Sequence, residues 1–241
     1  NLSEILTRVR AVGAAVGIAL DGDADRVGII DERGKYITTL NVFSLLALYL
    51  LENKQRRGPL VKGVTSSKML NKMGDIFGVD VHEMRVGFKN IGPKMTEVDA
   101  LMAGEESGGF AFRGHIPERD GILSGLYFLE YMAVTGKTPA QLVKTLFDRV
   151  GAHYYHRRDV QINAEDRNAI QERVNNPGLD RVGEFVVVDS DNIDGRRLHF
   201  KDGWLAARFS GTEPLLRIYA EADTYEKVDR MLDAASAYLG V

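Results

Sequence analysis

Three acidic residues alternate in a short loop near the start of the chain, where residues 21–32 read DGDADRVGIIDE. Asp21, Asp23 and Asp25 bring three carboxylates together, and a nearby cation would offset the repulsion between their negative charges. An EF-hand calcium loop has this spacing, with Glu32 as its last ligand, but Arg26 stands where that loop needs glycine. The flanking segments AAVGIAL and VGII are typical of buried strands, whereas an EF-hand lies between helices.

A strand–loop–strand that presents carboxylates to a hard divalent cation is the interpretation we favour for the acidic loop. Oxygen-only ligation on a short loop suits Mg²⁺, which keeps coordination positions open for a phosphate. The remaining alternative is an acidic turn exposed to solvent between two strands. The sequence therefore predicts a magnesium site formed by Asp21, Asp23 and Asp25.

A second unusual loop reads GEESGG at residues 104–109. Its glycines make it a poor helix and a poor strand, and they suit a turn in which the backbone comes close to a ligand. A carboxylate and a hydroxyl in such a turn could bind the neighbouring hydroxyls of a sugar. The alternative is a plain glycine-rich turn without a ligand.

A third loop reads RFSGTEP at residues 208–214. Ser210, Gly211 and Thr212 offer two hydroxyls and a run of backbone N–H groups that can form an anion-binding nest. Arg208 adds a forked cation for a phosphate, and Arg217 follows on the next strand. The alternative is an ordinary β-turn. Together, the three loops predict a cation site, a hydroxyl clamp and a phosphate cradle, which indicates phosphoryl chemistry on a sugar phosphate.

Composition restricts the other possibilities. The chain has 241 residues, a formal net charge of -3 and no cysteine, so it has no thiol nucleophile, disulfide or cysteine-ligated zinc. This charge gives no reason to expect a nucleic acid or a membrane as partner. The longest apolar run, residues 42–51, is too short to span a bilayer and is typical of a buried helix. The N-terminal segment lacks the apolar core of a signal peptide, so a cytoplasmic location is expected.

The order of elements predicts two domains of different class. Strands around the acidic loop and at 60–64 and 79–84 alternate with helices at 40–54 and 121–135, which indicates a three-layer α/β domain, with a mixed sheet and helices on both faces. The segment VGFKNIGPKM is expected to be a loop before a helix that ends near residue 99. After Gly151, the segments EFVVVD, RRLHF, WLAARF and LLRIYAEA predict a smaller α+β domain with a mostly antiparallel sheet.

The three motifs GIALDGDADRVGIID, GEESGG…HIPERDGI and RFSGTEPLLRIYAEA, in this order, resemble the α-D-phosphohexomutase family of phosphoglucomutases and phosphomannomutases. VGFKNIG at residues 86–92 resembles a further loop of that family's third domain. The resemblance implies that Asp21, Asp23 and Asp25 bind Mg²⁺ and that Arg26 lies near the phosphoryl group.

The resemblance also implies substrate contacts in the other loops. Glu105 and Ser107 match residues that bind sugar hydroxyls, and Lys89 and Arg119 are expected as further catalytic contacts, with His115 close by in a structural role. The phosphate that is not transferred would be bound by Arg208, Ser210, Gly211, Thr212 and Arg217.

One feature of the family is missing from the sequence. Its members carry the transferred phosphoryl group on a serine in a loop like Thr-Ala-Ser-His-Asn-Pro, and no such loop occurs here. The resemblance therefore assigns residues 1–35 to the end of the family's second domain, 36–149 to the third and 150–241 to the fourth. We expect a fragment whose partners are its own N-terminal domains and a hexose phosphate, and which is inactive in isolation.

With those domains present, the resemblance implies interconversion of hexose 1-phosphate and hexose 6-phosphate, with hexose 1,6-bisphosphate as intermediate and activator. Two alternatives remain. An aspartyl-phosphate phosphatase also presents Asp-x-Asp after an apolar strand, but Asp25 stands where such enzymes usually have Thr or Val. A sugar-phosphate-binding module derived from a mutase would keep the RFSGTEP loop without turnover.

Overall fold

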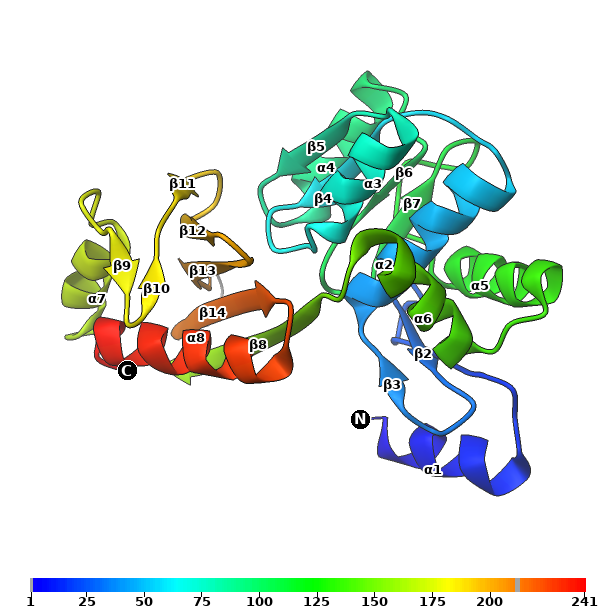
Figure 1. Cartoon of the computed structure of the whole chain (residues 1–241), viewed down its shortest axis with the longest axis horizontal. Helices are drawn as coiled ribbons and strands as arrows, with labels where there is room; N and C mark the ends of the chain where they lie inside the picture. Colours follow the sequence, from blue (N-terminus) through cyan, green and yellow to red (C-terminus); the bar gives the residue numbers. More distant parts are fainter. Residues whose placement is uncertain (1, 211–212) are drawn as a thin grey trace. The chain divides into compact units, whose positions relative to one another are not determined.

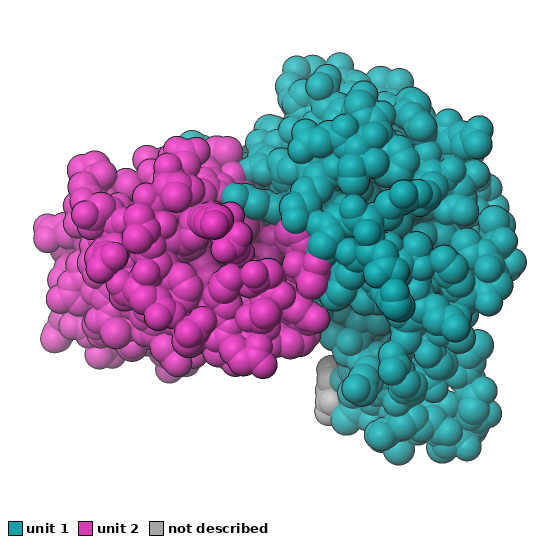
Figure 2. All heavy atoms as spheres, viewed as in Figure 1, with its two compact units in different colours: residues 1–151 teal, residues 152–241 magenta. Residues whose placement is uncertain are grey.

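A computed structural model describes residues 2–210 and 213–241 and divides the chain into two compact units. The units are Asn1–Gly151 and Ala152–Val241, and Figure 2 colours them teal and magenta. Each unit has a hydrophobic core of its own. No helix within the described ranges is long and apolar enough to cross a membrane.

The first unit contains two sheets and their covering helices, most of which are labelled in Figure 1. Its helices are α1 (Ser3–Val12), α2 (Thr39–Leu48), the π-helix η1 (Tyr49–Asn53), α3 (Met69–Phe77), α4 (Phe88–Glu97), α5 (Gly121–Thr135) and α6 (Pro139–Val150). Its strands are β1 (Gly17–Leu20), β2 (Val27–Ile30), β3 (Tyr36–Ile37), β4 (Leu60–Gly63), β5 (Val81–Met84), β6 (Met102–Gly104) and β7 (Phe110–Phe112).

The smaller sheet of the first unit is an antiparallel meander in the order β1-β2-β3. The acidic loop joins its first two strands, which confirms the predicted strand–loop–strand. Residues 1–35 belong to the same compact unit as the elements that follow, and their assignment to a separate family domain stays a prediction.

The larger sheet has the order β5-β4-β6-β7, with β4 parallel to β5 and β6 and with β7 antiparallel to β6. Helix α4 packs on one face, and helices α2, α3, α5 and α6 share the core on the other face. The mixed sheet between two helical layers confirms the predicted fold class. The carboxyl ends of its parallel strands meet at one edge, which is where ligands bind in open α/β sheets.

The apolar run at residues 42–51 is buried, as the sequence predicts. The expected single helix over 40–54 is instead an α-helix that ends at Leu48 and continues as the π-helical turn η1. Leu45, Leu48 and Leu51 are each 0% exposed. A helix whose side chains are buried all round is typical of a protein core.

The segment VGFKNIGPKM is not the predicted loop, because α4 already begins at Phe88 and includes Pro93. Phe88, Ile91 and Met95 recur at helical spacing and are buried against the sheet. Proline removes one backbone N–H from a helix. The burial of this apolar face outweighs that loss, so the helix forms earlier than the sequence predicts.

The second unit is an α+β domain with antiparallel strand pairing, as the sequence predicts. Its five-stranded sheet has the order β11-β12-β13-β14-β8, and helix α8 packs on β14 and β8. Its elements are β8 (Tyr154–Gln161), α7 (Arg167–Val174), β9 (Arg181–Val182), β10 (Phe185–Val186), β11 (Asp189–Asp191), β12 (Arg196–Phe200), β13 (Gly203–Phe209), β14 (Leu215–Ala222) and α8 (Tyr225–Leu239).

The segment EFVVVD is not the single strand that the sequence predicts. Its first part, β10, pairs with β9 in a separate two-stranded sheet, and β11 then pairs with β12 in the main sheet. The chain changes partners in between, at Val187 and Val188, whose N–H groups donate to the carbonyl oxygens of Asp180 and His199 respectively. Local strand propensity cannot show such a change of sheet.

Candidate active site

The acidic loop turns the chain over between the paired ends of β1 and β2. The N–H of Ala24 donates to the carbonyl oxygen of Asp21 at 3.2 Å, and Ala24 has a φ of 59°. Carboxylate oxygens of Asp21, Asp23 and Asp25 consequently lie within 4.8 Å of one another. The alternation of carboxylates in the sequence therefore becomes a cluster in space.

Glu32, the last ligand of the EF-hand alternative, serves another purpose. Its Oε1 accepts a hydrogen bond from Thr138 Oγ1 at 2.9 Å, and its Oε2 accepts one from the N–H of Ala140 at 3.3 Å. Glu32 thus caps the start of α6. The strands on both sides of the acidic loop also exclude an EF-hand, so that alternative is wrong.

Two arginines contact the acidic loop. Arg26 Nε lies 3.1 Å from Asp21 Oδ2 and 3.5 Å from Asp25 Oδ1. Arg119, which lies far along the sequence just before α5, places Nη2 2.7 Å from Asp25 Oδ2. These contacts place two positive charges beside Asp21 and Asp25.

The surroundings shift the pKa values of the carboxylates in different directions. Desolvation raises the pKa of Asp21, but the N–H and guanidinium of Arg26 lower it further, so it lies below its ordinary value. Burial raises the pKa of Asp25 by more than Arg119 lowers it, and Asp21 and Asp23 add to the rise. Burial also raises the pKa of Glu105, against the lowering effects of the Gly87 N–H and Arg119.

Arg119 joins the acidic loop to the GEESGG turn. Its Nη1 lies 3.8 Å from Glu105 Oε2, and its guanidinium carbon lies 5.5 Å from the centre of the Phe88 ring. The other oxygen of Glu105 accepts a hydrogen bond of 2.8 Å from the N–H of Gly87. Three segments that are distant in sequence therefore meet around one guanidinium.

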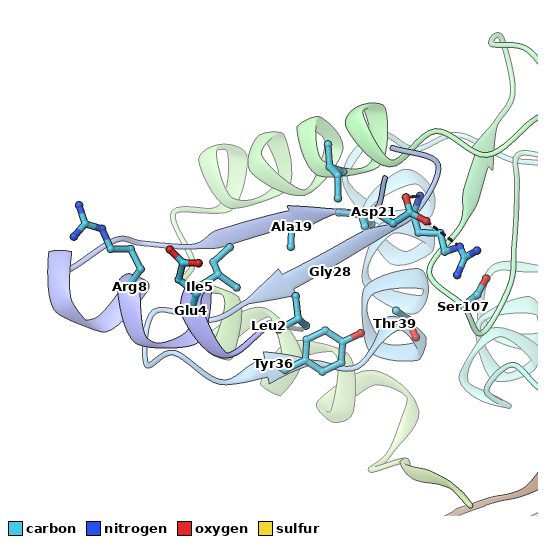
Figure 3. Close-up of a pocket in the computed structure, with 13 residues that line it drawn as sticks. Leu2, Glu4, Ile5, Arg8, Ala19, Asp21, Gly28, Tyr36, Thr39 and Ser107 are labelled. Carbon is cyan, nitrogen blue, oxygen red and sulfur yellow. Dashed lines mark hydrogen bonds and ion pairs between the residues drawn. The ribbon is translucent and has the colours of Figure 1, made fainter. Parts of the chain in front are cut away.

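The GEESGG turn is hydrogen-bonded to the strand that leaves the acidic loop. The N–H of Val27 donates to the carbonyl oxygen of Gly108 at 3.1 Å. Within the turn Glu105 is buried and Ser107 is exposed. Ser107 and Asp21 lie at one end of an open cleft of ≈ 560 Å³, whose other end is lined by α1 (Figure 3). Arg26 also lines this cleft. The predicted hydroxyl clamp and the predicted metal loop are thus neighbours.

Lys89 and His115 are the remaining predicted residues of the first unit. Lys89 is the second residue of α4 and is exposed; its substrate contact stays a prediction. His115 Nε2 lies 3.0 Å from Asp120 Oδ2. Asp120 in turn caps α5 by accepting a hydrogen bond of 2.7 Å from the N–H of Leu123. This contact is consistent with the structural role expected for His115.

The RFSGTEP loop connects β13 to β14 in the second unit. Arg208 stands directly opposite Arg217 in the strand ladder. The N–H of Ser210 donates to the carbonyl oxygen of Leu215 at 2.8 Å, and Ser210 Oγ accepts a hydrogen bond of 3.3 Å from the N–H of Glu213. The predicted phosphate contacts Gly211 and Thr212 lie outside the described residues. That the three loops form one site stays a prediction.

The acidic cluster fits a hard divalent cation. Asp25 Oδ1 is buried and accepts no hydrogen bond from any described residue, although Arg26 Nε lies 3.5 Å away. A buried carboxylate oxygen without a donor is costly unless a cation approaches it. Three carboxylates on one short loop are also the donor type that Mg²⁺ prefers. Asp21, Asp23 and Asp25 are therefore the residues that could hold it.

Two supporting residues were not singled out by sequence reasoning. Phe88 provides the ring beside Arg119. Gly121 donates its N–H to the carbonyl oxygen of Ala24 at 2.9 Å, and a Cβ at this position would lie 2.6 Å from the carbonyl oxygen of Arg26. The sequence signal was the pairing of a glycine with the acidic residue before it in ERDG. Only the fold shows that this glycine presses against the acidic loop.

Two family models match this chain. Residues 41–150 match "Phosphoglucomutase/phosphomannomutase, alpha/beta/alpha domain III", and residues 162–237 match "Phosphoglucomutase/phosphomannomutase, C-terminal domain". The fold and the site thus define an α/β protein of the phosphohexomutase type. The chain belongs to the phosphoglucomutase/phosphomannomutase family of α-D-phosphohexomutases, as the motifs predict.

Individual relatives agree with this assignment. The chain is 33% identical over 233 residues to the phosphoglucomutase/phosphomannomutase of Thermococcus kodakarensis, which covers 97% of this chain and 49% of the relative. It is 30% identical to the phosphoglucosamine mutase of Lactococcus lactis, over 94% of this chain and 47% of the relative. A crystal structure from Thermus thermophilus, with a provisional phosphomannomutase assignment, superposes with a TM-score of 0.83 at 31% identity, covering 100% of this chain and 49% of that one. The chain thus spans about half the length of these relatives.

Proposed function

We propose that this chain supplies the metal-binding, sugar-binding and phosphate-binding parts of a phosphohexomutase. The whole enzyme would interconvert hexose 1-phosphate and hexose 6-phosphate through a phosphoserine and a hexose 1,6-bisphosphate, which would also act as activator. The observation that carries the proposal is the cluster of Asp21, Asp23 and Asp25, with Arg26 and Arg119 at its edge. This arrangement suits the stabilisation of a phosphoryl group in transfer.

The acidic cluster would hold Mg²⁺ through Asp21, Asp23 and Asp25. When bound, the ion would supply positive charge that offsets the negative charge on the phosphoryl oxygens. Arg26 lies 3.1 Å from Asp21, so it can orient that carboxylate and also contact a phosphoryl oxygen. Arg119 would keep Asp25 and Glu105 at a fixed separation, because it contacts both.

Glu105 and Ser107 would bind the sugar hydroxyls. The N–H of Gly87 and the guanidinium of Arg119 orient the Glu105 carboxylate, which leaves it ready to accept hydrogen bonds from vicinal hydroxyls. Lys89 would add a cation near the same loop. In both orientations of the sugar, the phosphate that is not reacting would be bound by Arg208, Ser210, Gly211, Thr212 and Arg217.

The phosphoserine would come from domains that lie outside this sequence, in the half of the relatives that the chain does not span. Those domains are the partner that we propose for this chain, and a cytoplasmic location fits a substrate that is a charged sugar phosphate. In isolation the chain would bind a hexose phosphate without turning it over.

Two measurements test the proposal. Isothermal titration of the 241-residue chain with Mg²⁺, and then with glucose 6-phosphate, should show that Asp23→Asn weakens metal binding and that Arg208→Ala weakens sugar-phosphate binding.

The product of the native gene should have a mass near twice the 26.7 kDa of this chain and should show mutase activity that Asp21→Asn removes. A native product of this chain's own mass that binds hexose phosphate without turnover would instead support the binding-module alternative. Phosphatase activity without a bisphosphate would support the phosphatase alternative.

A further inference from the structure

An acidic residue lies against the arginine that is predicted to bind phosphate. Asp194 Oδ2 is 3.3 Å from Arg208 Nε, and the two side chains are 22% and 16% exposed. A carboxylate repels a phosphate, so a carboxylate beside a phosphate-binding arginine should weaken phosphate binding unless it also has a favourable effect on that arginine. The contacts around Asp194 and Arg208 indicate which effect this is.

Arg208 has a like-charged neighbour. It stands opposite Arg217 across the β13–β14 ladder, which puts both side chains on the same face of the sheet. Like charges that are directly opposite on neighbouring strands repel each other. Arg217 has carboxylates of its own, with Glu213 Oε2 at 3.0 Å from Nη2 and Asp159 Oδ2 at 3.7 Å from Nε. Asp194 provides the corresponding charge for Arg208.

The turn that carries Asp194 packs closely against the backbone of β13 at Arg208. The next residue, Gly195, has a φ of 76°, and a Cβ there would lie 2.6 Å from the carbonyl oxygen of Ala207 and 3.0 Å from Arg208 Cβ. Only glycine fits a backbone pressed this closely against β13. The contact between Asp194 and Arg208 therefore depends on the path of the backbone.

The other side of this turn is also held in place. Asp191, at the end of β11, accepts a hydrogen bond of 3.3 Å from the N–H of Ile193 and one of 2.8 Å from Arg197 Nε. It also lies 2.9 Å from His199 Nε2. These contacts of Asp191 fix the start of the β11–β12 turn, which carries Asp194.

We propose that Asp194 is a positioning residue that directs the Arg208 guanidinium toward the phosphate of a hexose phosphate. Because the carboxylate contacts Nε, the two terminal nitrogens of Arg208 can donate hydrogen bonds to two phosphate oxygens. The inference rests on the proposed function, in which Arg208 binds phosphate. It adds a residue, and a role for the β11–β12 turn, to the phosphate-binding loop.

The sign of a binding change tests this role. The probe is glucose 6-phosphate, with inorganic phosphate as a second ligand, titrated calorimetrically into the full 241-residue chain. If Asp194 acted only through its charge, Asp194→Ala and Asp194→Asn would tighten binding, because each removes a negative charge. If it positions Arg208, both weaken binding, by about tenfold for the alanine variant. Asp194→Glu keeps the charge and should recover part of the affinity.

A double variant separates positioning from general damage to the fold. Asp194→Ala should have no further effect in an Arg208→Ala background, because the residue through which it acts is gone. Asp233→Asn is the control, since it breaks a more exposed ion pair of the same unit, with Arg158 at 2.9 Å, and should leave affinity unchanged. The NMR signal of the Arg208 Nε–H should shift in Asp194→Asn and stay in place in Asp233→Asn.

The outcomes distinguish this inference from the proposed function. Tighter binding in Asp194→Ala, or equal weakening in both Arg208 backgrounds, would overturn the positioning role while Arg208→Ala still showed a phosphate site. A wild-type chain that bound neither ligand would refute the proposed function itself, and the inference would fall with it.

Discussion

The packing of Gly121 against the acidic loop yields a quantitative prediction. In Gly121→Ala, the new Cβ would lie 2.6 Å from the carbonyl oxygen of Arg26 and 2.8 Å from that of Ala24. Both are backbone atoms, so no side-chain rotation relieves the contact. An ordinary contact of 3.4 Å requires the loop or the start of α5 to move by about 0.8 Å.

The energetic consequence follows from three effects. Overpacking of this kind costs about 1–3 kcal/mol, and weakening the hydrogen bond from Gly121 N–H to Ala24, now 2.9 Å long, costs about 1 kcal/mol. Alanine recovers up to about 1 kcal/mol through its helix propensity. We expect a net destabilisation of about 2 kcal/mol, and a Mg²⁺ affinity lower by about tenfold because the three carboxylates lose their spacing.

The assay combines urea unfolding, hydrogen exchange and Mg²⁺ titration. Exchange should increase in the peptides that cover residues 20–27 and the start of α5. Gly125→Ala on the same helix is the control: its Cβ would meet only side-chain atoms of Ile18, at 3.2 and 3.5 Å, and these can move. A Gly121→Ala variant as stable as Gly125→Ala, with unchanged Mg²⁺ affinity, would show that this contact does not position the acidic loop.

Two further predictions concern single carboxylates. Glu32→Gln should lower the free energy of unfolding by about 1 kcal/mol, because it weakens the cap that includes Thr138; a fall in Mg²⁺ affinity in the same variant would restore the ligand role that we reject. Desolvation raises the pKa of Asp191, but hydrogen bonds from His199 and Arg197 lower it further, to below its ordinary value. Asp191 therefore stabilises the second unit above the unfolded-state pKa of about 4 and loses this effect as the pH falls through the lower folded-state pKa. Acid unfolding should become less steep in Asp191→Asn, and an unchanged acid limb would contradict the assignment.

Local sequence patterns were sufficient for much of the fold and for the chemistry of the loops. The acidic loop is a hairpin, and a hairpin brings its own residues together, so the spacing of Asp21, Asp23 and Asp25 already predicted a cluster. The start of α6 is also a local feature, since Thr138 and Gln141 form a full capping box there and Pro139 follows the cap. These features depend on neighbours within a few residues.

The predictions that failed concern segments whose structure depends on distant contacts. The helix α4 forms through Pro93 because its apolar face is buried on the sheet. EFVVVD contains β10 and only the first residue of β11, because the chain changes partners between them. In both cases, packing against distant segments outweighs the local helix or strand propensity.

The chemical groups at the site, the class of each domain and the family follow from residue types and short-range order, so the amino-acid sequence was sufficient for them. Which of these groups meet depends on the folded arrangement of the chain. It brought Arg119 to Asp25 and Glu105, placed Glu32 at the start of α6, and placed Asp194 beside Arg208. Such pairs depend on how sheets and helices pack, and packing is set by the summed burial of many residues rather than by the spacing of any two.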